Sequence, residues 1–295
     1  MPLLTAGALA LLDVGRLDPL RLVGGLALSG VIATAAYYLK ALNVSGALGA
    51  VLIGTSVFAF GGWTWGFLLI AFFVTSSALS HYRARDKQGL AAEKFDKGSR
   101  RDWGQVLANG GVGALLALAH LLWPYPWLLA AFVAAIATVN ADTWATELGV
   151  LSKQPPRLIS SGKPVAVGTS GGVTALGMLA AVSGALLISL VIVLLLGGRA
   201  LLRHPQELTT MQGIGLLVVA LVGGLAGALF DSLLGATVQV IYYSPTRQKE
   251  TEKRIDPDGK VNSYRRGWRW LNNDAVNFLS SLFGAAVGAA VFLLF

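Results

Sequence analysis

The stretch AAFVAAIATVNADTWATELGVL, residues 130–151, decides the fold class of this chain. It is apolar enough to cross a bilayer, yet it contains the carboxylates of Asp142 and Glu147. A charged side chain at membrane depth costs at least about 2.5–3.5 kcal/mol on insertion scales, so an acid there marks a functional site by default. Asp231 and Asp274 lie in comparable surroundings. The four acids together predict a polar chamber inside a helical membrane bundle.

The composition supports this interpretation, because 55% of the 295 residues are hydrophobic and only 13% are charged, with a mean hydropathy of +0.64. Soluble domains carry about 25% charged residues. A transmembrane helix needs about 20 apolar residues. Such runs fall at 22–41, 43–60, 63–80, 105–122, 126–147, 172–197, 213–240 and 274–294. The runs are continuous rather than alternating, which excludes a β-barrel. We predict an all-α, polytopic bundle of about eight spans, with residues 1–295 forming one membrane domain.

Basic residues gather in three of the loops between these spans. Of the 23 Lys and Arg residues, seven lie in 81–104, three in 152–171 and eight in 241–270. With eight spans these loops share one side, which the positive-inside rule makes cytoplasmic. We therefore expect cytoplasmic loops at 81–104 and 241–272, and both termini outside. Basic loops beside spans follow from topology, so the expected partner is the lipid bilayer and not nucleic acid.

Smaller features add detail and exclude some chemistry. The sequence Asp-Pro-Asp-Gly at 256–259 is a strong turn signal, which predicts a hairpin or lid within 241–272. Residues 3–12 are apolar but too short to span, which is typical of an interfacial helix. The chain has no cysteine and its three histidines lie far apart, so thiolate and zinc sites are not expected.

The first polar constellation surrounds the two acids of residues 130–151. On a straight helix Asp142 and Glu147 point about 140° apart, so either the helix breaks or the two acids play different parts. Asn140 shares the face of Glu147 at a spacing of seven residues. Oxygen ligands of this kind suit Mg²⁺, which takes one or two carboxylates and completes its shell with water and phosphates. The alternative is a buried polar network that only fixes helix packing.

A second constellation is the glycine-rich sequence that precedes the sixth apolar run. Gly168, Thr169, Ser170, Gly171 and Gly172 come directly before this run. Backbone N–H groups at a helix start form a natural phosphate cradle when glycines allow close approach. The sequence lacks the Lys of a P-loop, but Arg157 and Lys163 lie upstream and could neutralise phosphate. A simple N-cap turn is the alternative.

The remaining candidates border other spans. Asp231 is followed by Ser232, and Asn273 and Asn277 form one polar stripe on the last span. Asp274 could instead only complement the helix dipole. Arg100 and Arg101 precede a helix on which Gln105 and Asn109 share a face, an arrangement that could lead a phosphorylated substrate into the bundle.

Five ordered motifs resemble those of a known integral-membrane family. They are QVLANGG (105–111), NADTWATELG (140–149), GTSGGV (168–173), FDSLLGATVQ (230–239) and NNDAVN (272–277). The family contains phytyl-phosphate kinase of the tocopherol pathway and eukaryotic transmembrane protein nineteen. The resemblance extends over the chain from about residue 40 onward. It implies transfer of a phosphoryl group from a nucleotide, CTP, to a prenyl monophosphate whose chain is phytyl, geranylgeranyl or farnesyl.

We therefore expect a Mg²⁺-dependent prenyl-phosphate kinase whose active site lies on the cytoplasmic side. Asp142 and Asp231 are the expected metal ligands, with Glu147 as a further ligand or a supporting group. Residues 168–172 would hold the nucleotide phosphates with Arg157 and Lys163, while Arg100 and Arg101 would neutralise phosphate charge. Asn109, Asn273 and Asn277 would orient the acceptor. A general base is not required, because the attacking phosphate oxygen is already ionised at neutral pH.

Two other functions agree with the same residues. A cytidylyltransferase would attach the nucleotide to a lipid phosphate and release pyrophosphate. A transporter or lipid scramblase would also place carboxylates inside the membrane, at broken helices near the midplane. A homodimer is compatible with the sequence.

Overall fold

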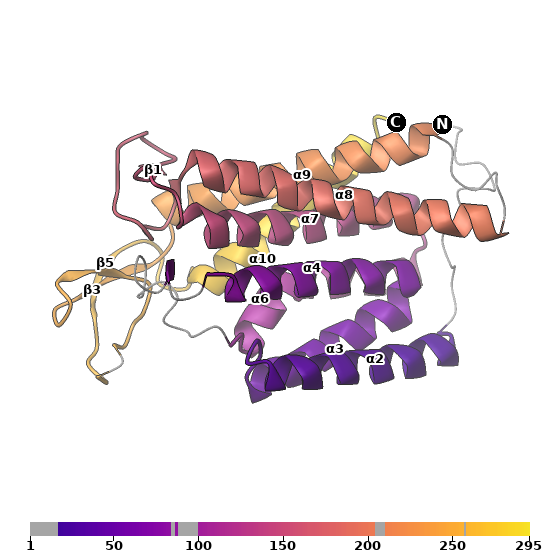
Figure 1. The fold of residues 1–295 in the computed structure, drawn as a ribbon, viewed down its shortest axis with the longest axis horizontal. Coiled ribbons are helices and arrows are strands. Elements are labelled where there is room, and N and C mark those ends of the chain that lie inside the picture. The colour runs from indigo at the N-terminus through magenta and orange to yellow at the C-terminus, as the bar shows by residue number, and fades with distance from the viewer. Residues whose placement is uncertain (1–16, 84–85, 88–99, 204–209, 257) are drawn as a thin grey trace.

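The computed structural model describes residues 17–83, 86–87, 100–203, 210–256 and 258–295 (Figure 1). In this part of the chain eight helices are long and apolar enough to cross a membrane. They are α2 (Pro19–Tyr38), α3 (Val44–Gly61), α4 (Trp63–His81), α6 (Trp103–Leu122), α7 (Pro126–Gly149), α8 (Ala175–Arg203), α9 (Thr210–Thr237) and α10 (Asn273–Phe292). The predicted helical bundle with eight spans is confirmed. The segment 3–12, expected at the interface, lies outside the described residues.

Helix boundaries differ from the apolar runs where polar side chains cap the ends. Asp102 begins α6 with a capping box: its carboxylate accepts from the Gln105 N–H at 3.0 Å, and the Gln105 side chain accepts from the Asp102 N–H at 3.2 Å. Asn272 caps α10 in the same way, by accepting from the Ala275 N–H at 2.9 Å. The sixth run was expected from residue 172, but α8 begins at Ala175 because Gly172 and Val173 form a strand.

Helix α7, which carries the opening stretch, is the central helix of the bundle. Of its most apolar window 78% is buried, against 22% for α2. It packs against α4, α6, α8, α9 and α10. Its buried polar side-chain atoms must therefore bond to neighbouring helices or to its own backbone.

Small residues set how α9 and α10 pack on α7. A Cβ added to Gly227 would lie 2.3 Å from the Thr138 side chain, and one added to Gly223 would lie 2.6 Å from the Ala134 Cβ. A Cβ added to Gly288 on α10 would lie 2.2 Å from the same Ala134 Cβ. Glycines at these positions therefore let α9 and α10 pack closely on α7.

Two small β structures lie at one end of the bundle (Figure 1). This end carries residues 81–83, 100–102, 150–174, 238–256 and 258–272, and we call it the basic end. Strand β1 (Arg157–Leu158) pairs antiparallel with β2 (Gly172–Val173). Strands β3 (Ile241–Ser244), β4 (Lys249–Thr251) and β5 (Ser263–Arg266) form an antiparallel sheet in the order β4-β3-β5.

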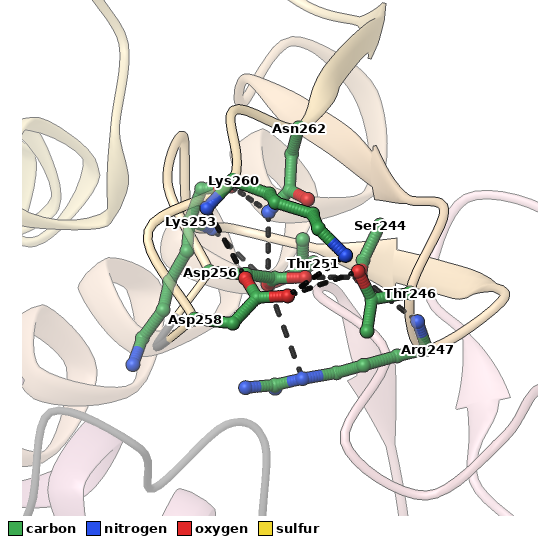
Figure 2. Close-up of polar contacts among 9 residues, drawn as sticks. All are labelled: Ser244, Thr246, Arg247, Thr251, Lys253, Asp256, Asp258, Lys260 and Asn262. Atoms are coloured by element: carbon green, nitrogen blue, oxygen red, sulfur yellow. Dashed lines mark hydrogen bonds and ion pairs between the residues drawn. The ribbon is translucent and has the colours of Figure 1, made fainter.

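The hairpin expected within 241–272 is thus part of a three-stranded sheet. Asp256 holds its loops together, as Figure 2 shows. The Asp256 carboxylate accepts from the Asn262 amide at 3.0 Å and from the Ser244 hydroxyl, and it lies 3.9 Å from the Arg247 guanidinium. The turn itself closes through the Gly259 N–H, which donates to the Asp256 carbonyl at 2.9 Å.

Candidate functional site: a polar cleft at the basic end

A cleft of about 90 Å³ opens at the basic end between α7, α8, α9 and the loop that joins β1 to α8. We call it the polar cleft. Its polar lining includes Asp142, Thr146, Thr169, Thr174 and Ser232, together with the backbone of Gly168 and Gly172. Residues from two of the predicted constellations, the acidic span and the glycine-rich sequence, therefore meet in one place.

Asp142 reaches the cleft from α7, where it is half-buried. Thr143, its neighbour, donates instead to the Val139 carbonyl at 2.7 Å and so is satisfied within its own helix. Asp231 does not line the cleft, although its neighbour Ser232 does, but it lies at the same level of the bundle as Asp142. Gly227 packs against Thr138, and Asp231 and Asp142 each lie one turn further along these two parallel helices.

The glycine-rich sequence forms a tight loop against α9. Gly168 and Gly171 have φ angles of +86° and +77°, which L side chains rarely adopt. A Cβ on Gly171 would lie 2.4 Å from the Ala236 nitrogen, so only glycine fits here. Thr174 accepts from the Gly177 N–H at 3.0 Å and caps α8. Gly168, Thr169 and Gly172 line the cleft, whereas Ser170 donates its hydroxyl to Glu252 on the far side of the loop.

Arg157 and Lys163 do not line the cleft. Both are exposed in the turn between β1 and the glycine-rich loop. The Arg157 guanidinium donates to the Gly162 carbonyl at 2.9 Å, which holds the turn. The structure therefore places these two cations next to the loop, as predicted, but outside the cleft itself.

Glu147 faces away from Asp142, toward α4. Its carboxylate accepts from the Ser80 hydroxyl at 2.6 Å and from the Lys87 ammonium at 2.6 Å. Helix α7 runs without a break from Pro126 to Gly149. The sequence left two alternatives, a broken helix or different roles for the two acids, and this geometry fits the second. The structure does not bring Glu147 and Asp142 together as ligands of one ion.

Asn140 is a packing residue in this structure. It is fully buried, its side-chain oxygen accepts from Thr75 at 3.1 Å and Ser76 at 3.3 Å, and its amide donates to the Gly184 carbonyl at 2.8 Å. These contacts join α4, α7 and α8 and satisfy the amide. Asn140 therefore belongs to a buried polar network that fixes helix packing, which was the alternative to a metal site.

Asn109 and Arg101 line a second depression, on the other side of the bundle. It lies between α2, α3, α4 and α6, and its other lining residues are mostly apolar. We call it the apolar groove. Arg100 is exposed and is not part of this lining. The residues expected to bind the acceptor are therefore divided, and only Arg101 and Asn109 share a pocket.

Asn273 and Asn277 lie half-buried in the first two turns of α10. Asp274 reaches the start of α6, where a Cβ on Gly104 would lie 2.9 Å from its Oδ2 atom. The same point is 3.4 Å from the Asp102 carboxylate, so two acids adjoin the N-terminal turn of α6. Asp274 also lies in the first turn of its own helix, α10, which is the position that the helix-dipole interpretation requires.

Lys87 is the residue that sequence reasoning missed. It was counted only as one of seven basic residues in a solvated loop, yet its side chain is 3% exposed and bound to Glu147. Two signals were present in the sequence: an acid in a span needs a cation, and this loop follows α4 directly.

The comparisons with known proteins agree with this architecture. Residues 27–285 match the family described as integral membrane protein DUF92. The chain belongs to this family. The matched residues include all five motifs from which the family resemblance was drawn, and that resemblance is confirmed.

Similar chains in this family come from distant organisms. The chain is 34% identical to Protein PGR of Arabidopsis thaliana, over 89% of this chain and 93% of that protein. It is 30% identical to an uncharacterized membrane protein of Methanocaldococcus jannaschii, over 86% of this chain and 87% of the relative. A Synechocystis membrane protein, also uncharacterized, is 26% identical over 82% and 79% of the two chains. Solved structures give no match.

Proposed function

We propose that this membrane protein is a kinase that converts a prenyl monophosphate to the diphosphate with a nucleoside triphosphate, CTP, as donor. The observation that carries the proposal is the polar cleft. There Asp142 and the glycine-rich loop adjoin at the end of the bundle where the basic loops gather. Carboxylate, backbone N–H groups and nearby cations are the components that phosphoryl transfer uses.

The residues of the cleft fit a magnesium ion carried in with the nucleotide. Among the described residues, groups of three or more His, Cys, Asp or Glu that could hold a metal are absent. Mg²⁺ is usually bound by one or two carboxylates and by substrate phosphates rather than by an all-protein cage. Asp142 lines the cleft and would supply one carboxylate, and Asp231, at the same level of α9 but outside the lining, would supply the second if it turned toward the ion. Bound there, the ion would neutralise charge on the β- and γ-phosphates.

The protein's own contribution is to hold and orient the two substrates. The Gly168 N–H binds the nucleotide phosphates at the cleft wall, because the Thr169 and Gly172 N–H groups already donate to the Ala166 and Thr169 carbonyls, at 3.1 and 2.9 Å. The acceptor's phosphate oxygen attacks the γ-phosphorus, the bond from that phosphorus to the β–γ bridging oxygen breaks, and CDP leaves. Because phosphoryl transfer depends mainly on position and charge, the chain supplies few reacting groups.

The test uses the purified full-length protein in detergent with geranylgeranyl monophosphate, Mg²⁺ and γ-labelled CTP. We expect label in the lipid phase as the diphosphate. Asp142→Asn should lower the rate at least a hundredfold. Asp18→Asn is the matched control: Asp18 caps α2, outside the cleft, and asparagine caps helices equally well.

The position of the label separates the alternatives. A cytidylyltransferase would release γ-label as pyrophosphate and would transfer α-label to the lipid. If neither label enters lipid with any nucleotide, while lipid or solute crosses vesicles that contain the protein, the kinase proposal is wrong and a transporter replaces it.

A further inference from the structure

The apolar groove has one charged residue at its end. Ile32, Ile53, Phe58 and Ile70 are part of its walls, while Arg101 and Asn109 are polar members of its lining. Such a groove offers apolar contact along its length and a positive charge at one point. This combination matches an amphiphile with a single chain and an anionic head.

Arg101 is fixed in place by its backbone. Its N–H donates to the Ala41 carbonyl at 2.9 Å, and its carbonyl accepts from the Asn43 N–H at 3.1 Å. Its guanidinium carbon lies 5.8 Å from the ring centres of both Phe72 and Phe73, which are also lining residues. The Arg101 backbone is thus held by the segment between α2 and α3, and its guanidinium lies against two rings of α4.

The surroundings of Arg101 favour an anionic ligand. Burial lowers the pKa of its guanidinium, and the carboxylate of Glu147 only opposes this effect. That carboxylate is already bound by Lys87 and Ser80. A phosphate at the groove end would compensate the desolvated charge and could form a bidentate contact with it.

The size of the groove limits what enters it. Its volume is about 70 Å³, and a buried water needs roughly 10–15 Å³ on this measure, so the space corresponds to about five waters. One branched five-carbon unit fills such a space. The rest of a long chain would extend into the bilayer.

We propose that the apolar groove binds a prenyl monophosphate, with the first isoprene unit between α2 and α4 and the phosphate at Arg101 and Asn109. This inference rests on the proposed function for the identity of the lipid and assigns that lipid a first binding site outside the polar cleft. Transfer then requires its phosphate to move from Arg101 to the cleft. It makes α2 and α3 the acceptor-recognition helices.

The test compares two neighbouring positions on α2. Ile32→Trp fills the groove, whereas Val31→Trp is the matched control, because Val31 is 67% exposed and outside the lining. We expect Ile32→Trp to weaken binding of geranylgeranyl monophosphate at least tenfold. Val31→Trp should not change it, and CTP affinity should stay the same in both. Ile70→Trp repeats the test from α4, in case the first variant does not fold.

Further measurements on the wild-type protein decide the matter without variants. A prenyl monophosphate with a diazirine in its first unit should crosslink to α2, α3, α4 or α6; crosslinks confined to α8 and α9 would overturn the proposal. Equal displacement by phosphatidate would also overturn it, because the groove would then hold ordinary phospholipid.

The variants separate this inference from the proposed function. Lost lipid binding in Ile32→Trp, with no phosphoryl transfer by the wild-type protein, would retain the groove and reject the kinase. Phosphoryl transfer together with normal lipid binding in Ile32→Trp and Ile70→Trp would retain the kinase and reject the groove.

Discussion

Lys87 and Glu147 form a buried ion pair, with 2.6 Å between Nζ and Oε2 and with 3% and 10% of the two side chains exposed. Ser80 donates to the other carboxylate oxygen at 2.6 Å. The pair joins the segment after α4 to the last turn of α7. Glu147 is therefore neutralised by protein contacts, whereas Asp142 on the opposite side of α7 lines the cleft.

Removing the cation should destabilise the fold strongly. In Lys87→Met the Glu147 carboxylate would remain buried without its counter-charge, and breaking such a pair costs about 3–5 kcal/mol. Thermal unfolding in detergent measures the loss. The double variant Lys87→Met/Glu147→Gln should recover most of it, because an amide needs no counter-charge. Arg83→Met is the control, since the Arg83–Asp86 pair is exposed and such pairs contribute about 1 kcal/mol or less. Equal losses in Lys87→Met and Arg83→Met would contradict this account.

Close packing between α7 and α9 predicts a second effect on stability. Gly227→Val would place side-chain atoms where Thr138 already lies, because even a Cβ comes within 2.3 Å. Overpacking a core commonly costs about 1–3 kcal/mol. Gly197→Val, on α8, is the matched control, since a Cβ there meets nothing within 4 Å. A melting temperature lowered equally by both substitutions would show that helix propensity, and not packing, is responsible.

Hydropathy, loop charge and helical geometry each predict a different part of this architecture from the sequence. Hydropathy placed all eight helices, because crossing a bilayer requires long apolar runs. Loop charge and the number of helices predict the topology, and this topology places Asp142 and the glycine-rich loop at the same end of the bundle. Helical geometry separated Asp142 from Glu147, because residues five positions apart face different directions.

Other features depend on tertiary contacts that periodicity does not contain. Seven basic residues in 81–104 were equivalent in the sequence, and only the packing of α4 on α7 selects Lys87 as the partner of Glu147. The separation of Arg101 from the polar cleft likewise requires knowing which helices adjoin α6. Asn140 looked like a site residue because its neighbours on α4 and α8 could not be identified from the sequence.

The Asp256 network predicts a pH response of the three-stranded sheet. Hydrogen bonds from Asn262 and Ser244, together with the charge of Arg247, lower the pKa of Asp256 below its usual value of 3.8. A lowered pKa stabilises the folded form above the usual value, and this contribution is lost as the pH falls from there through the lowered pKa. Protection of β3 and β5 amides against hydrogen exchange should therefore be constant from pH 7 to about 5 and should fall as the pH drops below 3.8. Asp256→Asn should make this fall smaller; an unchanged pH dependence in that variant would mean that another group is responsible.

The glycine-rich loop offers a prediction that separates backbone strain from contact with α9. Gly171 and Gly162 both have positive φ angles, +77° and +69°. A Cβ on Gly171 would lie 2.4 Å from the Ala236 nitrogen, whereas one on Gly162 meets nothing within 4 Å. Alanine at either position therefore introduces strain of about 1–2 kcal/mol, but only Gly171→Ala must also push the loop away from α9.

Since Gly172 and Thr169 line the cleft beside Gly171, displacement of the loop should disturb nucleotide binding. We expect Gly171→Ala to lower kcat/KM for CTP at least tenfold, or to lower the affinity for CTP if turnover is not detectable. Gly162→Ala should change either quantity less than twofold, although its melting temperature should also fall. If the two variants bind CTP equally well, the loop does not contact the nucleotide, and the phosphates must be held elsewhere in the polar cleft.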